Sequence, residues 1–385
     1  MGPQPVSKGA SRYVAGEVTR FDQKNDMFCR SRWDPSLKEI SRKLWAPEEP
    51  REDIPGFTIK DFALEDAVWY IPINYTAGSY PGNRGLYSWN TKLWGVYGRP
   101  KTDMPMQVAD PAKMSRQIKK IARYLGASLV GICELDRRWL YSHEYDLRNG
   151  NHSPLEIPEE YKYAVVLGYE MKYELIQMSP ARTHGFGIGM IYTRQAVVGS
   201  ILAQFIKHIG YKAIPMGNDT ANSIPLAIDA GLGEVGRMGL LMTPQFGPRL
   251  RLSKVFTNLP LATDKPIDFG VWEFCMQCKK CANNCPGQAI SFGNPTDQPN
   301  NISNRTGIMR WPLNAEKCLG WFAQNQGDCT NCTRVCPFNK PSGVLHDWVR
   351  WGVKNMPFLD FAFIKMDDFL GYGRRVKAET FWEDV

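Results

Sequence analysis

The sequence lacks several features that would place it in a broad class. No apolar run can cross a bilayer: the charge-free segments 183–193 and 195–206 have 11 and 12 residues, whereas a membrane-spanning helix needs about 20. No block of lysine and arginine stands out within the net charge of +8, so the charge is weak evidence for nucleic-acid binding. Residues 1–14 show neither an apolar stretch nor a twin-arginine pair, so we expect no targeting segment there.

The chain is long and apolar enough to fold around a core. It has 385 residues, of which 43% are hydrophobic and 22% charged. At roughly 150 residues per domain, this length favours about two domains. The composition excludes a disordered or fibrous protein.

Local patterns predict a layered core of helices and strands. Asp110 followed by Pro111 predicts a helix that ends before Gly126. Apolar runs predict strands at 127–135, 163–167, 211–215 and 250–256, and helices at 194–209 and 224–230. The segment 28–94 is rich in aromatic residues without a clear period, and we expect an irregular cap there.

Cysteine is the most informative residue type. Eight of the ten cysteines lie between Cys275 and Cys336, a crowding typical of metal ligation rather than of a disulfide framework. The first four follow the spacing C-x2-C-x2-C-x3-C-P of bacterial ferredoxins, and the last four repeat it with a longer first gap. Two runs of this kind predict two cubane [4Fe–4S] clusters.

The cysteine before each proline reaches the other cluster in such paired runs. We therefore assign one cluster to Cys275, Cys278, Cys281 and Cys336, and the other to Cys285, Cys318, Cys329 and Cys332. Zinc is the alternative, because CxxC pairs also suit tetrahedral zinc, but a four-cysteine run ending in Cys-Pro and present twice favours clusters. Cys29 and Cys133 are expected to be plain thiols.

Four motifs precede the cysteine runs: Asn-Asp-Thr at 218–220, Ile-Pro-Leu-Ala at 224–227, a glycine-rich segment at 230–237, and Phe-Gly-Pro-Arg-Leu-Arg at 246–251. Their order resembles the corrinoid-dependent reductive dehalogenases of the respiratory type, over roughly residues 111–340. The resemblance implies an α+β fold in which a nitroreductase-like α/β core binds base-off cobalamin. It also implies a ferredoxin-like domain with two [4Fe–4S] clusters and an aromatic-rich N-terminal cap. We expect boundaries at 1–109, 110–264, 265–345 and 346–385. The sequence contains no Asp-x-His-x-x-Gly run, and its five histidines are scattered, so we expect no histidine as the lower ligand of the corrinoid cobalt.

By the family pattern, Tyr192 occupies the position of the proton donor, with Asn218 and Arg251 as its partners. A nearby cation favours a phenolate and so lowers the pKa of a phenol. Arg251 would stabilise the phenolate, and Asn218 would orient the hydroxyl or polarise the departing halide. The ordinary alternatives are an amphipathic residue at the start of a helix for Tyr192, a turn residue for Asn218 and a strand-edge charge for Arg251.

The remaining site predictions concern the corrinoid and the substrate. Ser223, Gly233 and Arg237 are candidate corrinoid contacts, since glycine lets a backbone approach a ligand closely; helix capping is the alternative role for the glycines. A Rossmann site is disfavoured because these glycines follow a helix. The candidate lining of an aromatic substrate pocket is Tyr80, Trp89, Trp94 and Trp321, although each could equally be a core residue.

The resemblance predicts an oxidoreductase that removes halide from small chlorinated hydrocarbons, as the terminal reductase of organohalide respiration. It implies a small integral-membrane anchor protein, a membrane electron donor and no nucleic-acid partner. It also implies a location on the outer face of the cytoplasmic membrane, the export signal having been removed. Two alternatives stay open: an epoxyqueuosine reductase, which modifies tRNA, and a simple iron–sulfur electron-transfer protein.

Overall fold

The computed structural model describes residues 3–76, 84–90, 105–341 and 343–383. Its helices are α1 (Met27–Trp33), α2 (Lys38–Leu44), α3 (Ile59–Tyr75), α4 (Pro111–Tyr124), α5 (Tyr173–Gln177), α6 (Arg182–His208), α7 (Ser223–Asp229), α8 (Val271–Gln277), α9 (Lys280–Asn283), α10 (Ala315–Asn325), α11 (Asn331–Arg334), α12 (Val344–Asn355), α13 (Asp360–Phe369) and α14 (Thr380–Glu383). Its strands are β1 (Gln4–Pro5), β2 (Phe21–Asp22), β3 (Leu129–Glu134), β4 (Tyr141–Tyr145), β5 (His152–Pro154), β6 (Tyr163–Glu170), β7 (Ala213–Met216), β8 (Glu234–Val235), β9 (Leu241–Met242), β10 (Leu250–Thr257) and β11 (Ile267–Asp268).

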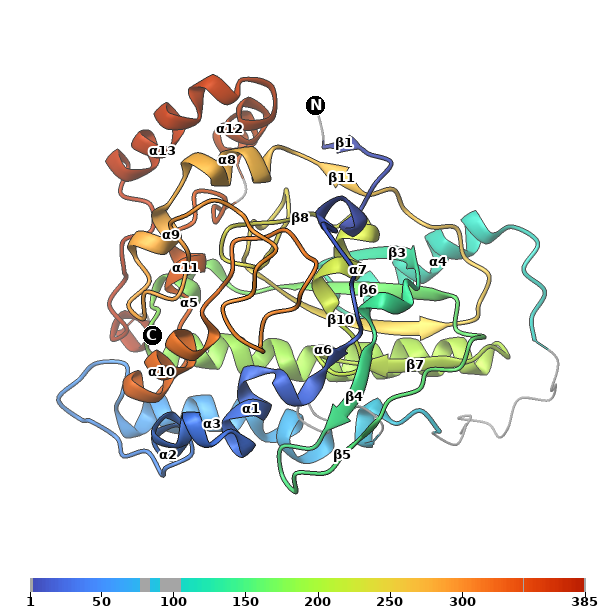
Figure 1. Cartoon of the computed structure of the whole chain (residues 1–385), viewed down its shortest axis with the longest axis horizontal. Helices are drawn as coiled ribbons and strands as arrows, with labels where there is room; N and C mark the ends of the chain where they lie inside the picture. Colours follow the sequence, from blue (N-terminus) through green and yellow to red (C-terminus); the bar gives the residue numbers. More distant parts are fainter. Residues whose placement is uncertain (1–2, 77–83, 91–104, 342, 384–385) are drawn as a thin grey trace.

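A four-stranded antiparallel sheet in the order β3-β6-β10-β7 lies at the centre of the molecule (Figure 1). Successive residues of a strand point to opposite faces, and β6 is buried on both. Val165 and Leu167 face the core that is covered by α4 and α6, whereas Ala164 and Val166 face the core that is covered by α7. The mixture of helices and strands confirms the predicted α+β class.

The predicted helix after Asp110 is present as α4. The Asp110 carboxylate accepts a hydrogen bond from the backbone N–H of Lys113 at 3.0 Å, which satisfies a donor at the helix start. The predicted strands and the helix at 224–230 also form, with small shifts at their ends.

The predicted start of the helix at 194 is wrong, because α6 begins at Arg182. The glycines near its start do not break the helix; they let α3 pack closely on it. A Cβ atom at Gly189 would lie 2.5 Å from Cγ2 of Val68, and one at Gly185 would overlap the Glu65 carboxylate. Tyr192 therefore lies well inside a helix rather than at its start.

The segment 28–94 is more regular than expected. Within its described residues it contains most of α1 and all of α2 and α3. The N-terminal strands also tie distant parts of the chain together: β1 pairs with β11, and β2, β4 and β5 form a small separate sheet.

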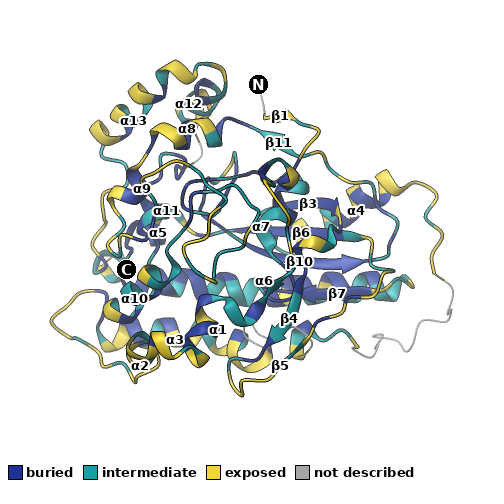
Figure 2. Ribbon diagram, viewed as in Figure 1, coloured by how far each residue is buried: buried dark blue, intermediate teal, exposed yellow. Residues whose placement is uncertain are grey.

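Burial follows this architecture, since the central sheet and much of α6 are buried while α12 and α13 are largely exposed (Figure 2). Contrary to the expectation from the sequence, one helix among the described residues, α6, is long and apolar enough to span a bilayer even with Arg194 inside it, and more than half of that stretch is buried inside the molecule. Its length and apolar character are accounted for by its place in the core.

Candidate active site and cluster ligands

The structure brings the first predicted ligand set together. Cys275 at the end of α8, Cys278, Cys281 in α9 and the distant Cys336 are all buried in one core cluster. Burial raises the pKa of the Cys275 thiol to about 12, because the apolar surroundings disfavour a free thiolate. A metal centre removes this penalty, since a coordinating thiol is deprotonated.

Arg237, a predicted corrinoid contact, supports this set in the structure, and its contact with a corrinoid stays a prediction. Its guanidinium is buried and donates hydrogen bonds to the carbonyl oxygens of Cys275 and Cys278 at 2.7 and 3.1 Å. It also donates to the carbonyl oxygens of Ser291 and Gly293. With its donors engaged in this way, Arg237 fixes the loop that carries the first three cysteines.

The second predicted set lines one cavity of about 180 Å³, which contains Cys285, Cys318, Cys329 and Cys332 in its wall. Trp321 and Thr333 also line it, and their Nε1 and Oγ1 atoms are buried without a hydrogen-bond partner among the described residues. Trp321, predicted as part of a substrate pocket, thus lies in the same cavity wall as this cysteine set, and its place in a substrate pocket stays a prediction.

Tyr192 and Asn218 meet as expected. The Asn218 amide nitrogen donates to the Tyr192 hydroxyl oxygen at 2.9 Å, and the Arg251 guanidinium lies 5.9 Å from the centre of the Tyr192 ring. On another side of the tyrosine, Trp69 from α3 lies with its ring centre 5.0 Å away. Sequence reasoning missed Trp69, because nothing in the irregular-looking segment indicated that a helix would bring it there.

A network of buried groups holds the turn that carries Asn218. Lys254, buried in β10, donates to the carbonyl oxygens of Gly217 and Asp219 at 2.6 and 3.1 Å. Thr220 has a φ of +71°, a conformation that is uncommon for a residue with a side chain. Burial lowers the pKa of Lys254 to about 8, against the opposing effect of Asp219. The turn is therefore held in place before any ligand binds.

A second element supports the same turn. The Tyr141 hydroxyl, at the start of β4, donates to the Asn218 carbonyl oxygen at 3.3 Å. The backbone N–H of Tyr141 donates to the carbonyl oxygen of Thr220 at 2.9 Å. No sequence pattern indicates this contact, because β4 belongs to the small peripheral sheet.

The cavity beside the second cysteine set fits a polar cofactor. Arg251 lines it together with Thr330, and within the described residues Arg251 Nε and Thr330 Oγ1 are buried without a hydrogen-bond partner. Such buried orphan groups are uncommon in a folded protein and indicate a missing ligand. An adjoining cavity of about 330 Å³ shares Leu313, Cys318 and Phe322 and extends to Asn222, so the space is large and mostly apolar, with a few polar groups in its wall.

The other predicted contacts have mixed outcomes. Gly233 packs against its own chain, because a Cβ there would lie 1.9 Å from the Met242 carbonyl oxygen; its approach to a corrinoid stays a prediction. The Ser223 hydroxyl accepts a hydrogen bond from Lys254 at 3.0 Å. Trp89 packs on the core beside the central sheet, while Tyr80 and Trp94 lie outside the described residues.

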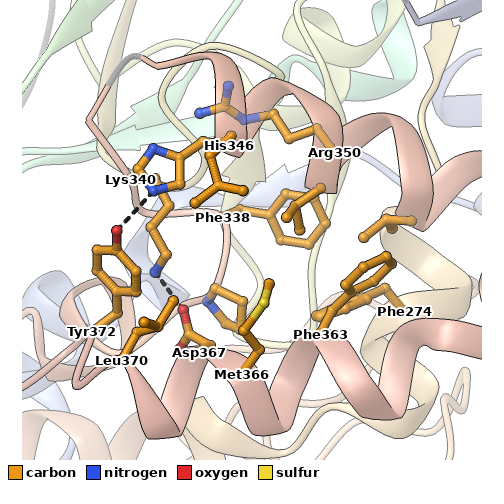
Figure 3. A pocket seen from close by; sticks show the side chains of 14 residues that line it. Phe274, Phe338, Lys340, His346, Arg350, Phe363, Met366, Asp367, Leu370 and Tyr372 are labelled. Atoms are coloured by element: carbon orange, nitrogen blue, oxygen red, sulfur yellow. Dashed lines mark hydrogen bonds and ion pairs between the residues drawn. The ribbon is translucent and has the colours of Figure 1, made fainter.

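A separate apolar pocket lies between α12, α13 and the first cysteine set (Figure 3). Phe274 and Phe338, which adjoin Cys275 and Cys336 in the core, form part of its wall. At its edge, Lys340 forms an ion pair with Asp367 at 2.6 Å. None of Tyr192, Asn218 and Arg251 borders this pocket, so it is not part of the candidate catalytic site.

Fold and site together indicate an iron–sulfur redox protein whose second cysteine set shares a cavity with Arg251, beside Tyr192. Comparison with known proteins agrees: residues 274–340 match the family model of the 4Fe-4S dicluster domain. The tetrachloroethene reductive dehalogenase of Sulfurospirillum multivorans is 36% identical over 384 aligned positions, which cover 92% of this chain and 76% of the relative. The chain belongs to the reductive dehalogenase family.

A solved structure described as a reductive dehalogenase that suggests a mechanism for B12-dependent dehalogenation supports the same family. It has a TM-score of 0.71 and 25% identity and covers 97% of this chain. The present chain spans about half of that solved chain, 49%. The prediction of a dehalogenase-type enzyme with two iron–sulfur clusters and a corrinoid is confirmed. The epoxyqueuosine reductase of Lactococcus garvieae matches over 30% of this chain, which makes that alternative the weaker one.

Proposed function

We propose that this chain reductively removes halide from small chlorinated hydrocarbons, with Tyr192 as the proton donor. The observation that carries the proposal is the 2.9 Å hydrogen bond between Asn218 and Tyr192, with Arg251 beside the ring and lining the cavity of the second cysteine set. The relative at 36% identity is named for tetrachloroethene, so chlorinated ethenes are the first substrates to test.

The overall reaction consumes two electrons and one proton: the carbon–chlorine bond breaks, chloride leaves and a carbon–hydrogen bond forms. A corrinoid, when bound, supplies the strongly reducing cobalt centre that cleaves the bond. This chain's own task is then to exclude water, to hold the substrate and to deliver a proton from the Tyr192 hydroxyl. Arg251 stabilises the phenolate that remains, because a nearby positive charge favours the ionised form of a phenol.

The two cysteine sets are proposed to hold [4Fe–4S] clusters in the grouping predicted from the sequence. The proximity of the second set to Arg251 supports a path in which electrons pass from the first cluster to the second and then to the corrinoid. The corrinoid is proposed to lie in a nitroreductase-like core, in the two adjoining cavities, with Ser223 as a candidate contact. Trp89 and Trp321 remain candidates for the wall of the substrate pocket, under an N-terminal cap.

The proton-donor role is tested by Tyr192→Phe in anaerobically reconstituted enzyme. Removing the hydroxyl takes away the proton source, and general acids contribute about 10²–10⁴-fold, so chloride release driven by reduced methyl viologen should fall at least about 100-fold. Tyr124→Phe, at an exposed tyrosine on α4, is the matched control and should keep wild-type activity. Full turnover by Tyr192→Phe with normal iron and corrinoid content would exclude the role.

We also propose peripheral attachment to the outer face of the cytoplasmic membrane through a small integral-membrane anchor protein, with a membrane electron donor. Exposed aromatic side chains on α12 and α13, among them Trp348 and Phe361, support a partner at this surface. In the native host, Trp348→Asp with Phe361→Asp should move the enzyme from the membrane fraction to the soluble fraction. Tyr124→Asp is the control, and an unchanged membrane fraction in the double variant contradicts the proposal.

A further inference from the structure

Two histidines and an aspartate meet on the small peripheral sheet, away from the cysteine sets. The His152 Nε2 atom lies 3.0 Å from Asp22 Oδ1, and the His143 Nδ1 atom lies 3.9 Å from Asp22 Oδ2. One ligand atom from each residue lies within 4.8 Å of the other two. The three side chains are partly exposed, so solvent can reach the space between them.

The strand pairing explains how residues far apart in the sequence come together. Asp22 of β2 is directly opposite His143 of β4, and His152 of β5 is opposite Tyr145, two positions further along β4. Diagonal neighbours of this kind on one face of a sheet are within reach of each other. The two imidazole rings stack with their centres 4.7 Å apart, so both present ring nitrogens toward the same carboxylate.

We infer that Asp22, His143 and His152 bind a divalent transition-metal ion of the zinc type. Zn²⁺ takes imidazole nitrogen and carboxylate oxygen at about 2.0–2.2 Å, and a site with three protein ligands leaves a position for water. In a tetrahedral site with such bonds, ligand atoms lie roughly 3.4 Å apart, and the unliganded atoms already lie within 4.8 Å of one another. The ligand set of nitrogen and oxygen distinguishes this site from the thiolate sets.

Two neighbours compete with a cation at this place. The Ser142 hydroxyl oxygen lies 3.0 Å from His143 Nδ1, so a bound metal must replace that contact. The Lys24 ammonium lies 3.8 Å from Asp22 Oδ2, so a bound metal must displace it. The Lys24 side chain is 40% exposed and flexible, and the ammonium can turn into solvent at small cost, because exposed ion pairs contribute little. In the absence of metal, the carboxylate is shared between Lys24 and the histidines.

The position of the site gives it a consequence for the proposed active site. His143 is on β4, two residues from Tyr141, whose hydroxyl and backbone N–H bind the turn that carries Asn218. A metal joining β2, β4 and β5 would make this sheet more rigid. The site is therefore a structural clamp at the periphery, which supports the Asn218 turn through Tyr141.

The test is a calorimetric titration of Zn²⁺ into holoenzyme with full iron content, after removal of loosely bound metal by a chelator. Full iron content ensures that the cysteine sets are occupied and do not bind the added zinc. The wild type should bind one Zn²⁺ per chain at this site. His152→Ala and Asp22→Asn should each weaken binding at least tenfold, and His208→Gln, which changes a histidine on α6, should leave it unchanged.

A second readout keeps the inference testable if a variant loses affinity through misfolding. Zinc should raise the midpoint of thermal unfolding of the wild type by a few degrees, because a ligand that binds the folded state stabilises it. It should have no effect on His152→Ala, whose midpoint without zinc should match that of the wild type. Absence of zinc binding by the wild type, or equal affinity in the wild type and His152→Ala, would overturn the inference.

Discussion

His184 is buried inside α6 with its imidazole against the backbone. Its Nδ1 atom lies 3.1 Å from the Ala181 carbonyl oxygen, and its Nε2 atom has no hydrogen-bond partner among the described residues. Burial lowers the pKa of the imidazole to about 4. The folded protein therefore holds this side chain neutral, whereas the unfolded chain protonates it near pH 6.5.

The sign of the pH effect follows from these two values. Between about pH 6.5 and 4 the unfolded state binds a proton that the folded state does not, so protonation favours unfolding and stability falls as the pH falls. The full difference of about 2.5 pKa units amounts to roughly 3 kcal/mol. His184→Asn should remove this contribution, so its anaerobic thermal unfolding midpoint should fall less than that of the wild type over this range. Parallel pH profiles of the two proteins would contradict the argument.

At the scale of single residues, the sequence indicated which side chains take part in the site better than it indicated what surrounds them. The cysteine grouping could be predicted from spacing, because in paired runs the cysteine before proline reaches the other cluster, and it stays a prediction. Tyr192 and Asn218 could be paired through a family resemblance. The surroundings of Arg237 could not be predicted, because an arginine after a glycine-rich segment suits both a phosphate and a set of backbone carbonyls. The Asp22, His143 and His152 cluster depends on strand pairing across 130 residues, which no local pattern reveals.

At the scale of secondary-structure elements, the candidate site depends on the packing of α3 on α6. A Cβ added at Gly189 would lie only 2.5 Å from Cγ2 of Val68 and 3.1 Å from the Trp69 indole nitrogen. Gly189→Ala should push α3 outward and move Trp69 from Tyr192. Overpacking of this kind costs about 1–3 kcal/mol, so we expect a lower unfolding midpoint and a severalfold lower rate of chloride release.

The matched control is on the same helix. At Gly199 the nearest atom to an added Cβ is the Ser253 hydroxyl oxygen at 4.0 Å, so Gly199→Ala meets no obstacle. Because alanine favours a helix over glycine by up to about 1 kcal/mol, this variant should be as stable as the wild type or slightly more so. If both alanine variants behave alike, the close packing of α3 is not what matters.

The start of α6 shows why element boundaries are harder to predict than element types. Three glycines at 185, 187 and 189 weaken the local preference for a helix, so the periodic pattern becomes clear only near Arg194. The helix nevertheless extends to Arg182, because tertiary packing against α3 outweighs that preference. The strands that pair with β6 and β10 could likewise not be predicted from the sequence, because the pairing of separate strands depends on contacts between distant segments.

At the scale of the whole molecule, the C-terminal helix α13 sets the charge around the first cysteine set. Lys280, between Cys278 and Cys281, forms ion pairs with Asp367 and with Asp368, and Lys340 also pairs with Asp367. The carboxylate of Asp367 acts electrostatically on Cys278. A segment far outside the cysteine runs thus contributes negative charge near one end of the proposed electron path.

Asp367→Asn should make the first cluster easier to reduce. Loss of a buried negative charge stabilises the more negative reduced state, and a unit charge roughly 10 Å away at an effective dielectric constant of 20 contributes about 1.7 kcal/mol. Since 59 mV corresponds to about 1.4 kcal/mol for one electron, the reduction potential should rise by about 50 mV after partial screening. An EPR-monitored redox titration of the holoenzyme measures the shift.

The adjacent Asp368 provides the control for this electrostatic effect. It binds the same lysine at 2.6 Å, but its side chain is 55% exposed, whereas that of Asp367 is 5% exposed. Water and salt screen an exposed charge much more strongly than a buried one, so Asp368→Asn should shift the potential by a small fraction of the effect of Asp367→Asn. The second cysteine set lines a cavity that Asp367 does not border. The reduction potential of the second cluster should therefore change less than that of the first cluster in either variant. Equal shifts in the two variants would assign the effect to loss of the Lys280 contact rather than to buried charge.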